Sequence, residues 1–133
     1  MSVVVDSSVI VAALVDAGPD GIWAENIVEG GALYAPELAP VEATNILRRL
    51  ELGKKITRME ADAAYEDLMQ LEIELFPFAP FAERIWELRA TITSYDAWYV
   101  SLAEAIGSPL ATLDERLAKA PGSKCEFLTP GRR

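Results

Sequence analysis

The sequence predicts a single α/β domain in which a short parallel sheet lies between layers of helices. Short apolar segments alternate with longer amphipathic segments along the whole chain, as strands alternate with helices in this fold class. The first apolar segment, Val3-Val4-Val5, is a continuous β-branched run typical of a strand buried on both faces. With 133 residues, 51% of them hydrophobic, the chain is long enough for one core and too short for a second. No repeat or linker interrupts residues 1–133, so we expect one domain.

Five segments are expected to be strands because they are short, apolar and bounded by turn-forming residues: 3–5, 33–35, 73–76, 110–112 and 126–128. Seven segments have helical periodicity or capping residues at their ends: 9–14, 20–29, 40–52, 57–71, 80–92, 94–106 and a short helix from Asp114 or Glu115. Glycines follow three of these helices, at positions 30, 53 and 107, and should terminate them.

Two further expectations concern the second half of the chain. The aromatic segment 76–81 is expected to be a buried connection. The helix 94–106 is apolar on most sides, which predicts a buried helix, and Ser101 and Glu104 should form its solvent-facing stripe.

The composition excludes several kinds of site. The chain has no histidine, which excludes Ser-His-Asp and Cys-His catalysis and histidine zinc ligands. Its lone cysteine, Cys125, excludes an internal disulfide and a cysteine cluster for a metal. Lys plus Arg number 12 and Asp plus Glu 21, and the net charge of −9 disfavours direct attraction to nucleic-acid phosphates. The sequence shows no signal peptide and no apolar run of the roughly 20 residues that span a membrane, so we expect a cytoplasmic protein.

Four acidic residues are expected at one edge of the sheet. Asp6 directly follows the strand 3–5, and Asp114 lies two residues after the strand 110–112. Glu42 and Asp96 lie in the first turns of helices that should start from the same edge. Ligands of open parallel sheets bind at the carboxyl ends of the strands. Asp96 lies off the polar stripe of its helix, and no lysine or arginine close in sequence could pair with it.

Carboxylates gathered at one edge repel each other, by roughly 4 kcal/mol for a pair about 4 Å apart at an effective dielectric near 20. Either some of them become protonated or a divalent cation neutralises them. Oxygen ligands alone favour Mg²⁺ or Mn²⁺ over Zn²⁺. Such a site can activate water for attack on a phosphodiester.

Each acid also has a purely structural interpretation. Asp6 could cap the first helix, and the segment 112–115 (Thr-Leu-Asp-Glu) fits a capping box. Thr93 with Asp96 fits one more loosely, and Glu42 would be favoured by the helix dipole. The convergence of all four acids on one edge favours a common site.

Four segments together resemble the PIN-domain family, and within it the VapC-type toxin ribonucleases of toxin–antitoxin systems. In chain order they are VVVDSSVIVA (3–12), PVEATN (40–45), YDAWYVSLA (95–103) and LATLDERL (110–117). The resemblance covers essentially the whole chain. It implies a PIN-like three-layer fold and a Mg²⁺- or Mn²⁺-dependent endoribonuclease that cleaves RNA. It also implies a homodimer held inactive by a VapB-type antitoxin.

The family's acidic, metal-binding positions fall on Asp6, Glu42, Asp96 and Asp114. Asn45, Thr112 and Ser7 match polar positions that orient these ligands. Whether Glu115 joins the site or only caps a helix stays open.

Basic and aromatic residues have weaker functional interpretations. Residues 48, 49, 54, 55 and 58 form a basic cluster that could position RNA phosphates, although complementing a helix C-terminus explains it more simply. Arg116 and Lys119 are alternative phosphate contacts. Trp23, Trp86 and Trp98 could stack on bases, but core or dimer contacts are the commoner role of such residues.

Two other classes of function compete with the nuclease. A phospho-receiver module has a similar length and an acidic Mg²⁺ pocket, but it needs an Asp after the third strand and a Lys after the fifth. Here Phe76-Pro77 follows the third strand, and no lysine follows the strand 110–112. A catalytically idle PIN-like binding module is the other alternative, and the complete acid set disfavours it.

Overall fold

The computed structural model describes residues 1–131 and contains one parallel sheet, in the order β3-β2-β1-β4-β5. Its strands are β1 (Ser2–Val5), β2 (Ala32–Pro36), β3 (Ile73–Phe76), β4 (Leu110–Ala111) and β5 (Phe127–Leu128). All five predicted strands are confirmed, with ends that differ by one residue or none.

The helices of the described residues are α1 (Ser7–Val15), α2 (Pro19–Glu29), α3 (Ala39–Leu52), α4 (Arg58–Gln70), the 3₁₀ helix η1 (Ala79–Phe81), α5 (Ala82–Glu87), α6 (Ser94–Ile106) and α7 (Glu115–Ala118). The predicted termination of α6 at Gly107 is confirmed: this glycine has φ 67°, the left-handed conformation in which a side chain would be strained.

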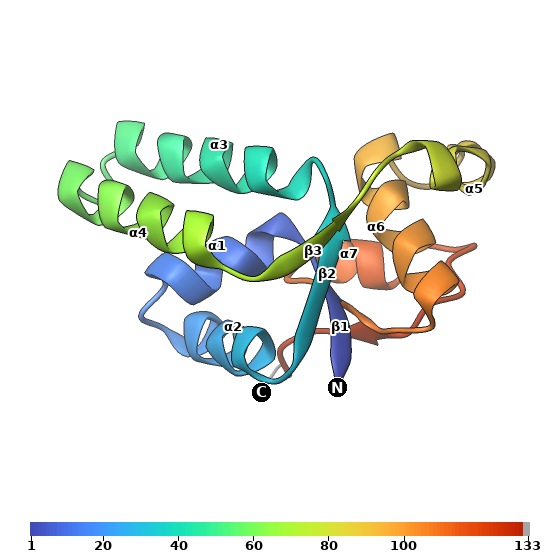
Figure 1. The fold of residues 1–133 in the computed structure, drawn as a ribbon, viewed down its shortest axis with the longest axis horizontal. Coiled ribbons are helices and arrows are strands. Elements are labelled where there is room, and N and C mark those ends of the chain that lie inside the picture. Colours follow the sequence, from blue (N-terminus) through green and yellow to red (C-terminus); the bar gives the residue numbers. More distant parts are fainter. Residues whose placement is uncertain (132–133) are drawn as a thin grey trace.

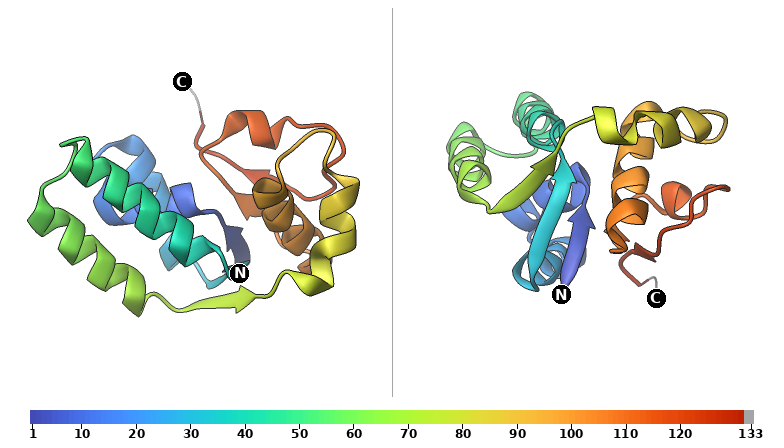
Figure 2. Two further views of the ribbon diagram at one scale, coloured as in Figure 1. Left: turned by 90° about the horizontal axis from the view of Figure 1, so that it is seen from above. Right: turned by 45° about the vertical axis from the view of Figure 1, so that its right-hand side comes forward.

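The sheet separates two groups of helices, which gives the predicted layered α/β fold. Figure 1 shows α1 to α4 on one side of the strands and α5 and α6 on the other, and both views of Figure 2 show the same division. Along the chain, β1 is followed by β2 and β3 on one side, and the chain then crosses to β4 and β5 on the other. The direction of strand order therefore reverses between β1 and β4, which is where open α/β sheets form a crevice for ligands.

The core lies on both sides of β1. Val4 and Val5 are fully buried, as are Ile10 of α1 and Val100 and Leu102 of α6. This burial on both faces explains why the first strand is a continuous apolar run. No helix in residues 1–131 has the length and apolarity that a membrane crossing requires.

The predicted helix 80–92 is shorter than expected. It consists of η1 and the six-residue α5, and the chain then turns through residues 88–92. Three β-branched residues, Thr91, Ile92 and Thr93, follow this turn and lose side-chain freedom in a helix. Thr93 is instead the extended N-cap of α6, and its Oγ1 accepts a hydrogen bond from the backbone N–H of Asp96.

Two expectations about exposure were wrong. The segment after β3 is not a buried connection: residues 77–80 are exposed because β3 is an edge strand and the chain leaves it over the surface. Phe78 is 47% exposed, and its ring packs edge-on against the ring of Trp98, with centroids 5.6 Å apart. Ser101 is not part of a solvent stripe but is 2% exposed. Its face of α6 lies toward α5, where Glu104 accepts a 2.8 Å hydrogen bond from Arg84.

Candidate active site

Asp6 lies where β1 ends and α1 begins, 8% exposed. Its backbone N–H donates to the carbonyl of Ala111, which ties it to the end of the neighbouring strand β4. Its carboxylate caps α1 by accepting from the backbone N–H of Val9, and it also accepts from the hydroxyl of Ser8. The capping role and the position at the carboxyl edge therefore both hold for this residue.

Asp114 lies just after β4, at the same edge. Its Oδ1 accepts hydrogen bonds from the backbone N–H groups of Arg116 and Leu117, at 2.9 and 3.2 Å, and so caps α7. The predicted capping box over 112–115 is wrong, because the N-cap is Asp114 and not Thr112. Thr112 instead lies fully buried beneath the site, where its hydroxyl bonds the Asp6 carboxylate and accepts from the backbone N–H of Asp114.

Glu42 is connected to α6 by a residue that the sequence reasoning missed. The hydroxyl of Tyr99 donates to Oε1 of Glu42 at 2.6 Å, and the Ser7 side chain interacts with the same hydroxyl. Tyr99 follows Asp96 by one helical turn and is 3% exposed. A buried tyrosine requires a partner for its hydroxyl, and that requirement was the signal available in the sequence.

Electrostatic interactions show that the four acids share one environment. Burial raises the pKa of Asp6 and of Glu42, and the charge of Asp96 raises both further. Burial also raises the pKa of Asp96, and the charge of Asp114 adds to this. Asp96 is therefore the common neighbour of the other three. Within residues 1–131, no lysine or arginine forms an ion pair with any of these carboxylates.

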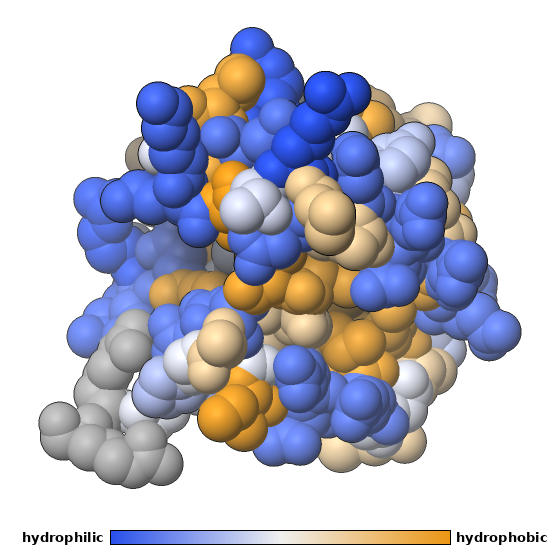
Figure 3. Space-filling view, turned by 90° about the vertical axis from the view of Figure 1, so that its left-hand side faces the viewer, coloured by the Kyte–Doolittle hydropathy of each residue, from blue (hydrophilic) through white to orange (hydrophobic). Residues whose placement is uncertain are grey.

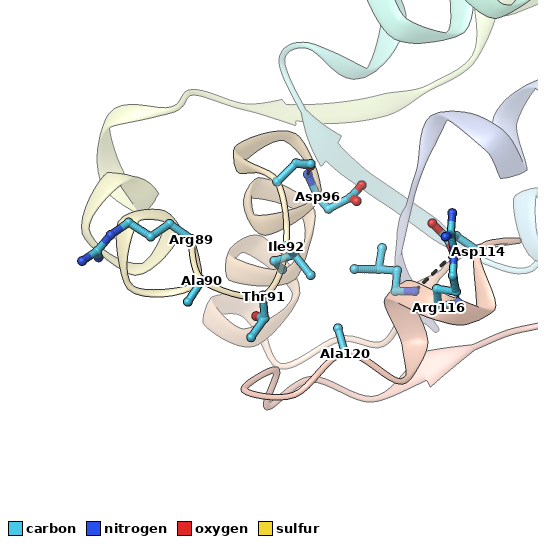
Figure 4. Close-up of a pocket in the computed structure, with 10 residues that line it drawn as sticks. Arg89, Ala90, Thr91, Ile92, Asp96, Asp114, Arg116 and Ala120 are labelled. Atoms are coloured by element: carbon cyan, nitrogen blue, oxygen red, sulfur yellow. Dashed lines mark hydrogen bonds between the residues drawn. The ribbon is translucent and has the colours of Figure 1, made fainter.

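A cavity of about 550 Å³ opens beside two of the acids, Asp96 and Asp114. Figure 4 shows the Asp96 carboxylate pointing from α6 toward Asp114, with Arg116 next to Asp114. Arg89, also at the cavity wall, directs its side chain away, and its guanidinium lies 4.2 Å from the ring centroid of Trp86. Neither Asp6 nor Glu42 lines this cavity.

The donor chemistry fits a hard divalent cation. The four side chains offer only carboxylate oxygens, and a bound cation would offset the burial and the charge repulsion that raise the pKa values of Asp6, Glu42 and Asp96. In Glu42 and Asp114, the hydrogen bonds within residues 1–131 engage a single oxygen, so the second oxygen is available to a ligand. In the same residues, no three acidic or thiol side chains are already gathered around one point.

The other predicted polar residues differ in position. Ser7 and Thr112 contact the site, as described above. Asn45 is exposed on α3, one turn beyond Glu42, and forms no hydrogen bond with residues 1–131. Ser8, which sequence reasoning did not single out, bonds Asp6 directly. Glu115 lies in the first turn of α7 and is partly buried.

The basic cluster of residues 48–58 lies away from the acids. It occupies the end of α3 and the turn to α4, which Figure 1 shows at the opposite end of the molecule from α5, α6 and α7. By contrast, Arg116 lines the cavity, and its side chain lies beside Asp114.

Another cleft, of about 350 Å³, lies between α1, α2 and α4. Leu14, Val15 and three alanines line it, with four acids among the remaining lining residues: Asp16, Glu25, Glu60 and Asp67. Figure 3 views the molecule from this end and shows apolar side chains in a band between two hydrophilic groups.

Comparison with known proteins identifies the family. The PIN domain model matches residues 3–123, so the chain belongs to the PIN-domain family. Ribonuclease VapC1 of Mycobacterium tuberculosis is 40% identical over 125 residues, which cover 93% of this chain and 94% of the relative. VapC ribonuclease Mb0985 of Mycobacterium bovis is 34% identical over 123 residues, covering 92% and 94%.

Solved structures show the same fold at low sequence identity. The FitAcB structure from Neisseria gonorrhoeae matches with a TM-score of 0.70 and 18% identity, covering 96% of this chain and 97% of that one. The VapBC2 structure from Rickettsia felis, bound to a DNA fragment from its promoter, matches with a TM-score of 0.65 and 15% identity, covering 96% and 98%. The PIN-like fold expected from the resemblance is confirmed.

Proposed function

We propose that this protein is a divalent-metal-dependent endoribonuclease and the toxin of a VapBC-type toxin–antitoxin pair. The observation that carries the proposal is the convergence of Asp6, Glu42, Asp96 and Asp114 on one sheet edge, in a chain without histidine. Two of these acids, Asp96 and Asp114, line a cavity. The ribonuclease names of relatives that align along nearly the whole chain support the reaction.

The four carboxylates would hold Mg²⁺ or Mn²⁺ at the carboxyl edge of the sheet. When bound, the cation neutralises phosphate charge and lowers the pKa of the water that attacks the phosphodiester. The chain's own contribution is positioning: Ser8 and Thr112 fix Asp6, and the α7 backbone fixes Asp114. Arg116, beside Asp114 at the cavity, binds an RNA phosphate next to the one that is cleaved.

Cleavage of a mixed pool of structured RNAs tests this function. The antitoxin-free protein should cut at a few sites with Mn²⁺ or Mg²⁺ and should lose all cutting in EDTA. The Asp96→Asn variant should fold normally and cut nothing, whereas Asp62→Asn, an exposed acid on α4, should cut like the parent. Retained cutting by both Asp96→Asn and Asp6→Asn would overturn the assignment of the site.

The partner we propose is a VapB-type antitoxin segment in the cleft between α1, α2 and α4. Structural neighbours are described as VapBC and FitAB assemblies. The apolar residues of the cleft suit an apolar helix face, and its four acids favour basic residues in the partner. Because Ala63 lines the cleft, Ala63→Arg should abolish inhibition by the antitoxin and leave RNA cleavage unchanged.

We also propose a homodimer in the cytoplasm, where its RNA substrate and antitoxin are made. Four large apolar side chains stay exposed along β3, the segment after it, α5 and α6: Leu75, Phe78, Trp86 and Tyr95. Their burial against a second copy would explain their exposure here. Sedimentation as a monomer at micromolar concentration would count against the dimer.

A further inference from the structure

We propose that Tyr99 is a positioning residue for the metal site, because its hydroxyl holds one oxygen of Glu42 and leaves the other oxygen to a divalent cation. The inference rests on the proposed function in one respect: it requires that the site binds a divalent cation. It assigns a role to a residue outside the four acids.

The contacts of Tyr99 connect three helices at the candidate site. Its hydroxyl, on α6, donates to Oε1 of Glu42 on α3 at 2.6 Å. Ser7, the first residue of α1, lies beside the same hydroxyl and interacts with it. A phenolic hydroxyl has one proton to donate, and a carboxylate oxygen can only accept, so the proton of Tyr99 is directed at Glu42.

This arrangement goes beyond the needs of a buried tyrosine. Tyr99 is 3% exposed and requires a partner, but a backbone carbonyl would satisfy that requirement. Its partner is instead a carboxylate of the candidate site, 57 positions away in the sequence. Glu42 is only partly buried, and its flexible side chain would otherwise lose several rotamers on binding a cation.

The second oxygen of Glu42 remains available. No hydrogen bond within residues 1–131 reaches Oε2. The charges of Asp96 and Asp6 act on Glu42, so this oxygen shares an environment with the other acids. Groups that hold metal-binding side chains in place typically change metal affinity 10- to 100-fold when they are removed.

Calorimetric titration with Mn²⁺ alone tests the proposal on the metal-free protein. Tyr99→Phe removes only the hydroxyl and should weaken Mn²⁺ binding about tenfold. Tyr65→Phe is the matched control, because Tyr65 lies on α4, outside the candidate site, is 46% exposed and should bind as the parent does. Glu42→Asp keeps the charge but shortens the side chain, so it should weaken binding to a similar degree and make a further Tyr99→Phe change ineffective.

Three results overturn the proposal: no measurable Mn²⁺ binding by the parent, unchanged binding in Tyr99→Phe, or the same loss from Tyr99→Phe in the Glu42→Asp background as in the parent. Melting curves of each variant exclude unfolding as the cause of a loss. Should Tyr99→Phe unfold, the Glu42→Asp variant alone decides, since unchanged binding there also overturns the proposal. Failure of the proposed function is a separate result, because the parent would then bind Mn²⁺ and cleave no RNA.

Discussion

The raised pKa values of Asp6, Glu42 and Asp96 make the stability of the metal-free protein depend on pH. A carboxyl group whose pKa is higher in the folded than in the unfolded protein favours folding when protonated. That contribution is fully present below the ordinary value of about 4 and is lost as the pH rises through the raised folded pKa. At neutral pH the cluster is therefore destabilising, and a cation or the loss of one charge relieves it.

This predicts the behaviour of Asp96→Asn in EDTA. Relative to the parent, the melting temperature of the variant should rise between pH 4 and pH 7.5, because the variant no longer carries the charge that Asp6 and Glu42 experience. Scanning calorimetry at several pH values measures the difference. The melting temperature of Asp62→Asn should follow that of the parent at a constant difference across this pH range. The same constant difference for Asp96→Asn would contradict the electrostatic account.

Arg116 provides a second prediction at the scale of one residue. In the non-cleaving Asp96→Asn background, Arg116→Ala should weaken the binding of single-stranded RNA. It should also reduce the slope of log affinity against log salt by about 0.7, the value for one lost phosphate contact. Arg49→Ala, at the distant end of α3, should change neither quantity. An equal effect of the two substitutions would mean that RNA does not approach through the cavity.

Among the elements, α5 is tied to α6 by the hydrogen bonds of Arg84. Arg84 donates to both oxygens of Glu104, at 2.8 and 3.1 Å, and to the carbonyl of Gly122 at 2.8 Å. The same carboxylate accepts from the backbone N–H of Lys124, so this group also holds the segment before β5. Because the Arg84 side chain is only 27% exposed, solvent screens these bonds incompletely.

Arg84→Ala should therefore lower the free energy of unfolding by about 1.5–3 kcal/mol, the range for hydrogen bonds to charged groups. Arg48→Ala, at an exposed position on α3, should change the free energy of unfolding by no more than about 0.5 kcal/mol. Urea denaturation followed by circular dichroism gives both values. Equal stability of the two variants would show that the Arg84 contacts contribute nothing net.

Elements with a strong local signal could be predicted from the sequence. The continuous run of valines predicted the buried strand β1, and the glycine at position 107 predicted the end of α6. The structure confirms both predictions. The exposure of Ser101 and of the segment 77–80 could not be predicted in this way. It depends on α5 packing over one face of α6 and on β3 being an edge strand. Both are features of the tertiary structure, which the periodicity of the sequence does not predict.

The candidate site shows the same limit. Its acids could be predicted because each follows a strand or begins a helix at the carboxyl edge, and the structure places them there. Their partners could not: Tyr99 meets Glu42 only once α3 and α6 are packed, and Thr112 supports Asp6 only because β1 pairs with β4.

On the scale of the whole molecule, the strand order explains why an acidic protein can have a site for a polyanion. The sheet reverses direction between β1 and β4, and this brings Asp6 and Asp114 together at its carboxyl edge while the basic cluster stays at the far end of α3. In the proposed function, a divalent cation at that edge would supply the positive charge that the composition lacks.

Crystals soaked with Mn²⁺ test this central claim most directly, through the anomalous scattering of the metal. The account predicts a peak at the carboxyl edge, among the carboxylates of Asp6, Glu42, Asp96 and Asp114, and its loss in crystals of Asp96→Asn. A peak elsewhere on the molecule, or none at millimolar Mn²⁺ in crystals where the site is open to solvent, would contradict it.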